Sequence, residues 1–183
     1  MPEHDPTSRG RGAAIAAAEV ADLPEVARLA DRIWREHYPG IIPMRQIDYM
    51  LERGYSIARL SRFLSETGAG LAIASVGGAR VGFAAWERDG PGTTKLDKLY
   101  VLASAHGRGV GRTLVGHVEA AALADGSATL TLRVNKQNAS SIAFYRAVGF
   151  GVDAETVEDI GGGFVMDDYV MAKPLRRAEG ARA

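Results

Sequence analysis

Three closely spaced glycines, Gly107, Gly109 and Gly111, follow a short apolar stretch and open a helix-like pattern. Glycine lets backbone N–H groups converge with no side chain in the way, and a helix N-terminus adds partial positive charge. A strand that turns through such glycines into a helix therefore suits a phosphate or pyrophosphate group. Arg108 and Arg112 add formal positive charge to this segment.

Neither common nucleotide motif fits the segment. A P-loop has the pattern G-x-x-x-x-G-K-S/T, but Arg112 replaces its lysine and His106 stands where its first glycine belongs. A Rossmann motif needs a third glycine, and Arg112 or Leu114 occupies that position. Two interpretations remain: an anion site of another type, and a glycine turn that only lets the helix pack closely on the strand.

A second motif lies after this helix and one short connection. It consists of Val134, Asn138, Phe144, Tyr145, Gly149 and Phe150, with Ser141 at a position where alanine is usual. The two segments together resemble the GNAT superfamily of acetyl-CoA-dependent N-acetyltransferases. That family carries Q/R-x-x-G-x-G/A after its fourth strand and V-x-x-x-N-x-x-A-x-x-F-Y-x-x-x-G-F further on. The resemblance extends to Ala21–Pro24, Val81–Phe83 and the closing segment 168–175.

The resemblance implies a mixed α/β (α+β) fold, with a central, mostly antiparallel twisted sheet flanked by helices, and acetyl-CoA as co-substrate. The backbone of Leu99, Tyr100 and Val101 would pair with the pantetheine arm, and the Val101 amide would face the thioester carbonyl. The residues implied to hold the pyrophosphate are His106, Gly107, Arg108, Gly109, Val110, Gly111, Arg112 and Thr113. His106 replaces the usual Gln or Arg, so we expect weaker or differently oriented contacts there.

The same resemblance gives roles to Asn138 and Tyr145. Asn138 would hydrogen-bond the cofactor near its sulfur end, and Tyr145 would protonate the departing thiolate. The residue types agree with this, because Asn138 is also a good helix N-cap and Tyr145 follows it by about two helical turns. The alternative is that Asn138 only caps the helix and that Tyr145 is only a core aromatic residue.

The chain contains no cysteine, which excludes disulfides, thiolate metal sites and a cysteine acyl-enzyme. The simplest chemistry is then direct attack of an amine on acetyl-CoA in a ternary complex. Asp97 is predicted as the general base, with Glu87 and a water chain as alternatives. His37 and His117 form no metal-ligating pattern, and we expect no metal.

The stretch 34–43 and the following 46–51 resemble the bacterial branch that includes polyamine acetyltransferases of the PaiA type. The predicted acceptor is a primary amine of a small molecule, with Glu36, Asp48 and Glu52 able to attract a polycation. These carboxylates are equally compatible with the solvated faces of amphipathic helices. A protein N-terminus or lysine is an alternative acceptor, and a non-catalytic acyl-CoA sensor is an alternative function.

The surrounding sequence predicts the elements that would position these residues. Helices are expected over 22–37, 43–54 and 56–66, with Asp22 as the first N-cap and with Met44 and Ile57 facing inward. Strands are expected over 14–19, 71–76, 81–86, 96–101, 130–134 and 164–173, with Gly77–Gly78 as a hairpin turn. Two more helices follow Gly107–Gly111 and begin at Asn138, the second ending at Gly149.

The length and net charge of the chain indicate the general class of protein. The chain has 183 residues, with 22 basic and 22 acidic side chains, so its net charge indicates no nucleic-acid or membrane partner. No stretch approaches the ~20 apolar residues of a membrane span. We expect a single domain over residues 13–175 with flexible ends at 1–12 and 176–183, in a soluble cytoplasmic protein. The resemblance also allows a homodimer.

Overall fold

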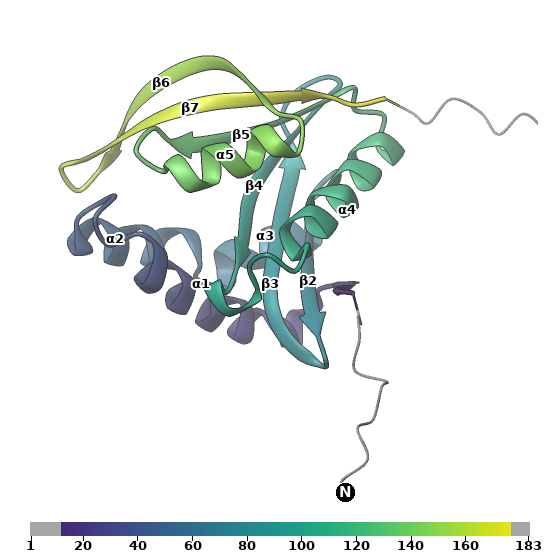
Figure 1. The fold of residues 1–183 in the computed structure, drawn as a ribbon, viewed down its shortest axis with the longest axis horizontal. Helices are drawn as coiled ribbons and strands as arrows, with labels where there is room; N and C mark the ends of the chain where they lie inside the picture. The colour runs from purple at the N-terminus through teal and green to yellow at the C-terminus, as the bar shows by residue number, and fades with distance from the viewer. Residues whose placement is uncertain (1–11, 177–183) are drawn as a thin grey trace, which may run out of the picture.

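The computed structural model describes residues 12–176 and has the mixed α/β architecture expected from the sequence, with a seven-stranded sheet flanked by helices (Figure 1). The N-terminal half contains β1 (Ala14–Ala17), α1 (Leu23–His37), α2 (Met44–Gly54), α3 (Ile57–Ser65), β2 (Gly70–Val76) and β3 (Ala79–Arg88). The C-terminal half contains β4 (Thr93–Val101), α4 (Val110–Ala124), β5 (Thr129–Asn135), α5 (Ala139–Ala147), β6 (Gly151–Gly161) and β7 (Phe164–Pro174). Short 3₁₀ turns cover Val20–Asp22 and Ala103–Ala105.

The first helices form where the apolar spacing predicts them, with three corrections. The predicted inner face of α1 is buried. Asp22, however, does not cap α1 with its side chain, because its carboxylate accepts a hydrogen bond from the Glu19 backbone N–H and pairs with Arg80. Met44 and Ile57, predicted to face inward, are exposed. Each is the first residue of its helix, and the buried face begins within the next turn, at Gln46 and Ile47 in α2 and at Leu60 in α3.

The sheet has the strand order β1-β2-β3-β4-β5-β7-β6, and all its pairings are antiparallel except that of β4 with β5. The predicted hairpin between β2 and β3 is present. The sequence interpretation missed β6, which pairs along β7. Most of β6 is exposed and it carries several carboxylates, so it lacks the apolar alternation that identifies a half-buried strand.

The two halves of the sheet separate between β4 and β5. Strand β4 pairs with β3 as far as Val101, but with β5 only through Thr93, Thr94 and Lys95. The β3–β4 register shifts between Ala85 and Trp86, which leaves Asp97 as an extra residue in β4. Such a bulge bends a strand and increases its twist. Beyond the bulge, the edge of β4 that faces β5 makes no ladder hydrogen bonds.

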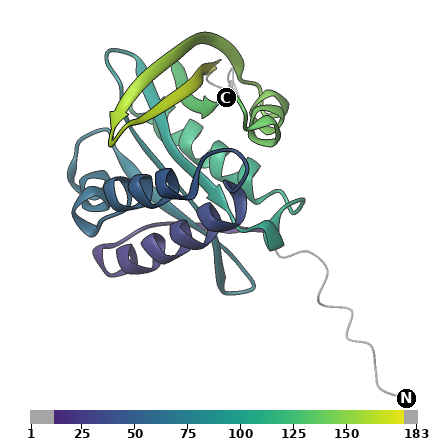
Figure 2. The same ribbon diagram turned by 90° about the vertical axis from the view of Figure 1, so that its left-hand side faces the viewer.

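Hydrophobic cores lie on both faces of the sheet. Ile73 and Phe83 pack with helices α1 to α3, whereas their neighbours Ala74 and Ala84 pack with α4, because successive strand residues point to opposite faces. Figure 2 shows the N-terminal helices lying across the front of the sheet. The gap between β4 and β5 is thus bordered by helices from both layers.

None of the described helices is long and apolar enough to cross a membrane. Apart from Gly12 and Arg176, the segments predicted as flexible ends lie outside the described residues.

Candidate functional site

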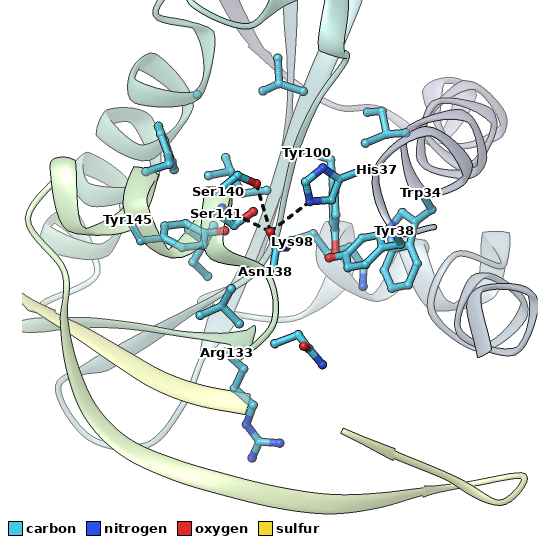
Figure 3. Close-up of a pocket in the computed structure, with 18 of the residues that line it drawn as sticks. Trp34, His37, Tyr38, Lys98, Tyr100, Arg133, Asn138, Ser140, Ser141 and Tyr145 are labelled. Carbon is cyan, nitrogen blue, oxygen red and sulfur yellow. Dashed lines mark hydrogen bonds between the residues drawn. The ribbon is translucent and has the colours of Figure 1, made fainter. Parts of the chain in front are cut away.

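A cavity of about 900 Å³ occupies the gap between β4 and β5 (Figure 3). Its walls come from the end of β4, the end of β5, the glycine loop, the start of α5 and the end of α1. Elements far apart in the sequence therefore converge here, and most of the predicted site residues line this cavity. The residues that do so are Asp97, Leu99, Tyr100, Val101, His106, Gly107, Gly109, Val110, Gly111, Arg112, Asn138 and Tyr145.

The glycine loop opens toward the cavity. Gly107 and Gly109 have φ values of +71° and +77°, a backbone region that favours glycine. A Cβ atom at either position would meet nothing within 4 Å, so space for a ligand adjoins the backbone there. Gly109 is also the N-cap of the 15-residue helix α4, and no side chain caps that end. Free N–H groups and the helix dipole are thus available to an anion.

Gly111 serves a different purpose from the other two glycines. A Cβ atom there would lie 3.1 Å from the ring of Phe144. The packing interpretation of the glycine segment therefore applies to Gly111, which lets α4 and α5 approach closely. Arg112 reinforces this contact because its guanidinium donates to the Ala147 carbonyl, 3.3 Å away.

His106, Arg108 and Thr113 complete the loop. The His106 Nε2 atom lies 2.9 Å from the Val101 carbonyl oxygen, and since that oxygen can only accept, Nε2 carries the proton. This bond ties the loop to the end of β4. Arg108 is exposed and Thr113 donates its hydroxyl to the Gly109 carbonyl, and neither lines the cavity.

Asn138 is 3% exposed and caps α5, as its residue type predicts. Its Oδ1 atom accepts from the Ser141 backbone N–H and the Ser140 hydroxyl, each at 3.3 Å. It also lies 3.2 Å from Nε2 of His37, at the end of α1 (Figure 3). This last contact joins the two layers of the molecule across the cavity, a feature that sequence reasoning missed.

Tyr145 is 9% exposed and lies between Phe144 and Phe150, with ring centroids 5.4 and 5.7 Å away. Figure 3 shows its hydroxyl pointing into the cavity, toward that of Tyr38 on the opposite wall. Burial raises the pKa of Tyr145 well above its usual value, and the neighbouring Tyr38 adds to this effect. Tyr145 therefore holds its proton at neutral pH and can only donate it.

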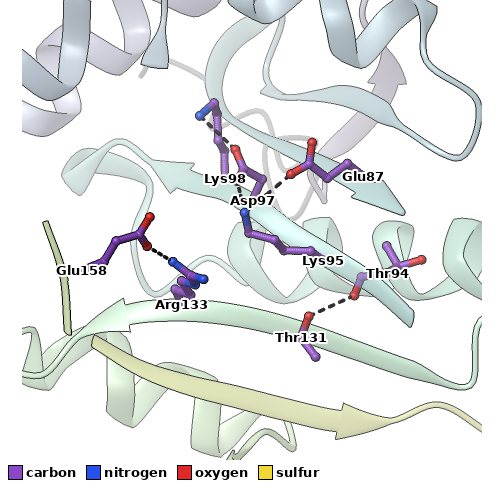
Figure 4. Close-up of polar contacts among 8 residues, drawn as sticks. All are labelled: Glu87, Thr94, Lys95, Asp97, Lys98, Thr131, Arg133 and Glu158. Atoms are coloured by element: carbon purple, nitrogen blue, oxygen red, sulfur yellow. Dashed lines mark hydrogen bonds and ion pairs between the residues drawn. The ribbon is translucent and has the colours of Figure 1, made fainter. Parts of the chain in front are cut away.

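Asp97 has an environment that opposes the predicted role of base. Its carboxylate pairs with Lys95 at 2.8 Å and with Lys98 at 3.1 Å (Figure 4). Burial alone would raise the pKa of Asp97, but the charges and hydrogen bonds of the two lysines outweigh it and lower that pKa to about 2. A carboxylate with so low a pKa is a weak proton acceptor. Glu87, the alternative, pairs with Lys95 at 3.5 Å and does not line the cavity.

Aromatic side chains form the cavity wall on the side of α1. Trp34 donates through Nε1 to the Tyr55 hydroxyl at 3.0 Å, and its ring lies 4.4 Å from that of Tyr38, centroid to centroid. Burial raises the pKa values of Tyr38, Tyr55 and Tyr100 well above their usual range. This wall is thus apolar, with neutral hydroxyl groups, a surface suited to the carbon chain of a ligand.

Of the three acidic residues predicted near the acceptor, Glu36 lines the cavity. It pairs with Arg32 at 2.9 Å. Asp48 instead pairs with Arg35 on the surface, at 2.9 Å, and neither it nor Glu52 lines the cavity. For these two, the alternative of a solvated helix face is the better description.

Sequence reasoning missed Asp168 as a site residue. It lies on β7, lines the cavity and is 5% exposed. The sequence signal was the pair Asp167–Asp168 within an otherwise apolar strand pattern. Among the described residues, no group of three or more histidines and carboxylates has the arrangement of a metal site.

Comparison with known proteins agrees with this geometry. Residues 26–150 match the model of the acetyltransferase (GNAT) family. An uncharacterized N-acetyltransferase of Mycobacterium tuberculosis strain H37Rv is 28% identical over 156 residues, which are 85% of this chain and 99% of that protein. The peptidyl-lysine N-acetyltransferase YjaB of Escherichia coli is 39% identical over 67 residues, 36% of this chain and 42% of that protein.

Solved structures show the same fold. The PaiA N-acetyltransferase of Thermoplasma acidophilum, in complex with coenzyme A, superposes with a TM-score of 0.75 at 24% identity, over 89% of this chain and 99% of that one. The structure of yncA from Salmonella typhimurium, with its cofactor acetyl-CoA, has a TM-score of 0.64 at 20% identity, over 94% and 99% of the two chains. The chain belongs to the GNAT family and is an N-acetyltransferase.

Proposed function

We propose that the enzyme moves the acetyl group of acetyl-CoA to a primary amine of a small molecule by direct attack in a ternary complex. The observation that carries this proposal is the cavity between β4 and β5, with an open glycine loop at one wall and a buried aromatic wall at another. One cavity thus borders two kinds of surface, one suited to an anionic cofactor and one to an organic acceptor.

The first of these surfaces fits acetyl-CoA, which supplies the activated acetyl group. The backbone of Gly107 and Gly109 adjoins open space, and the uncapped start of α4 offers N–H groups to the pyrophosphate. The edge of β4 from Leu99 to Val101 has no partner strand on the β5 side, which leaves its backbone groups for the pantetheine amides. Asn138 lines the same cavity and would contact the cofactor near its sulfur.

Tyr145 is the general acid of this proposal. Transfer leaves a thiolate on the coenzyme, and a proton donor next to that sulfur lowers the barrier to its departure. Burial keeps the Tyr145 hydroxyl protonated, and the hydroxyl points into the cavity. The chain has no cysteine to form an acyl-enzyme, and direct passage of the acetyl group from sulfur to nitrogen is the simplest route.

The acceptor proposed is a small amine, with a polyamine as the leading class. The aromatic wall would contact its methylene groups, and Glu36 would attract its charge. The matched PaiA structure supports this branch of the family, whereas the short match to a peptidyl-lysine N-acetyltransferase supports a protein lysine as the second candidate.

Release of CoA from acetyl-CoA tests the proposal, with a panel of 1,4-diaminobutane, spermidine, kanamycin, free lysine and a lysine-containing peptide. We expect turnover with the small polyamines, and a fall of about 10²-fold or more in kcat for Tyr145→Phe. Tyr169→Phe, on β7 and outside the cavity, is the matched control. Turnover of the peptide alone would favour the protein acceptor. Acetyl-CoA binding without turnover on any amine would leave the sensor function.

A further inference from the structure

The carboxylate of Asp168 is buried without a partner. The side chain is 5% exposed. Among the described residues, its Oδ1 atom is the only buried side-chain oxygen or nitrogen that has no hydrogen-bond partner. An ionised carboxylate in such a place is costly unless a cation or a donor satisfies it. Asp168 also lines the cavity, so its carboxylate lies at a wall that a ligand would contact.

Charged neighbours do not supply that partner. Burial is the largest influence on Asp168 and raises its pKa, to about 6 in all. The nearby basic side chains are engaged elsewhere: Arg133 pairs with Glu158, and Lys136 pairs with Glu155 and Asp167. The titratable groups that influence Asp168 or are influenced by it are Tyr38 just after α1, Arg133 on β5, Lys136 just after β5, Glu158 on β6 and Asp167 on β7.

Asp168 also faces the residues of the proposed reaction. Its charge contributes to the raised pKa of Tyr38, and Tyr38 in turn contributes to that of Tyr145, after burial in both cases. All three side chains line the same cavity, Tyr38 just after α1, Tyr145 on α5 and Asp168 on β7. An amine placed among them would have a carboxylate on one side and a proton donor on the other.

We propose that Asp168 is a catalytic residue that binds the ammonium group of the acceptor and accepts one of its protons before transfer. This role rests on the proposed function. An unperturbed alkylamine has a pKa of about 10.4 and is charged at neutral pH, so it must lose a proton to become a nucleophile. A buried carboxylate both attracts the ammonium group and, with its raised pKa, accepts a proton more readily than Asp97 does.

The step balances as follows. One proton passes from the ammonium nitrogen to Asp168 and from there to solvent. The nitrogen then forms a bond to the thioester carbonyl carbon, the carbon–sulfur bond breaks, and the sulfur keeps the bonding electron pair. The nitrogen loses its second proton to solvent as the amide forms. Tyr145 gives its proton to the departing thiolate and is reprotonated from solvent, so that one proton is released overall. No oxidant, reductant or metal is required.

The test compares wild type, Asp168→Asn and Asp167→Asn with acetyl-CoA and the panel amine that wild type acetylates. Asp167 is the matched control, because its 55%-exposed carboxylate is adjacent in sequence but pairs with Lys136 at 2.6 Å. For Asp168→Asn we expect kcat/KM for the amine to fall about 10²-fold or more at pH 7, with an unchanged Kd for acetyl-CoA. Asp167→Asn is expected to match wild type.

The pH profile separates a proton acceptor from a structural residue. In wild type, kcat/KM for the amine should fall below about pH 6 as Asp168 of the free enzyme becomes protonated. The difference in kcat/KM between Asp168→Asn and wild type should shrink as the pH rises toward about 10.4, where the amine is neutral without a protein base. A wild-type profile with no fall near pH 6, or full activity of Asp168→Asn, overturns the role of Asp168. Absence of wild-type turnover on every amine instead overturns the proposed function.

Discussion

Two carboxylates of the cavity, Asp97 and Asp168, have opposite environments. Two lysines hold Asp97 in its charged form, whereas burial without a partner disfavours the charged form of Asp168. Pairs of titratable groups whose pKa values are pushed apart in this way often divide acid–base roles between them. Here the paired carboxylate is held by two lysines of its own strand, and the unpaired one remains available for a ligand.

The pKa of Asp168 makes a prediction about stability that is independent of turnover. Because its folded-state pKa of about 6 exceeds the value of about 3.8 for an exposed Asp, the folded protein loses stability as the pH rises from about 4 through 6. Asp168→Asn removes this effect, so the variant should have a higher Tm than wild type above pH 6. The difference should shrink toward pH 4.

Thermal unfolding of both proteins from pH 4 to 8 measures this. A variant more stable and less active than wild type is the pattern expected of a functional group kept in an unfavourable place. A variant less stable than wild type at pH 8 would show that Asp168 has a stabilising partner, which contradicts the account.

At the scale of elements, the glycine loop between β4 and α4 depends on its backbone conformation. Gly107→Ala forces a side chain into a positive φ and places a Cβ atom in the space beside the backbone. We expect a rise of tenfold or more in the KM for acetyl-CoA and a loss of about 1 kcal/mol in the free energy of unfolding.

Gly126→Ala is the matched control for this change. Gly126 has a φ of +83°, a Cβ atom there would also meet nothing within 4 Å, and the residue lies outside the cavity, after α4. Gly126→Ala should lower the free energy of unfolding by a similar amount and leave the KM for acetyl-CoA unchanged. Equal KM values for both variants would show that the loop does not contact the cofactor.

The sequence predicts most elements because their apolar spacing is local. The buried faces of α1 and α4, the β2–β3 hairpin and the capping by Asn138 all follow from residues within one or two turns. The separation of β4 from β5 is not local, since it depends on a register shift against β3. The burial of Asp168 is also non-local, because α1 and β5 lie far from it in sequence.

The environment of Asp97, unlike that of Asp168, is indicated by its neighbours in the sequence. Lys95 and Lys98 flank it in the sequence, and their proximity already indicates an ion-paired carboxylate. The role of His37 could not be predicted in this way, because its partner Asn138 is 101 residues away in the sequence.

At the scale of the whole molecule, the division of the sheet creates one cavity with two kinds of wall. The glycine loop and the start of α5 belong to the C-terminal half. The aromatic wall comes from the helical region of the N-terminal half, with Tyr100 of β4 behind it. In the proposed function both substrates would be bound at the same time, with their reacting atoms between Tyr145, Tyr38 and Asp168. This arrangement, with no cysteine in the chain, predicts transfer in a single ternary complex.

Initial-rate kinetics test this central claim most directly. CoA release is measured while acetyl-CoA and the acetylated panel amine are varied together. We expect double-reciprocal lines that intersect, because in a ternary complex both substrates must be bound before either product leaves. Parallel lines, which indicate an acetylated enzyme intermediate, would contradict it.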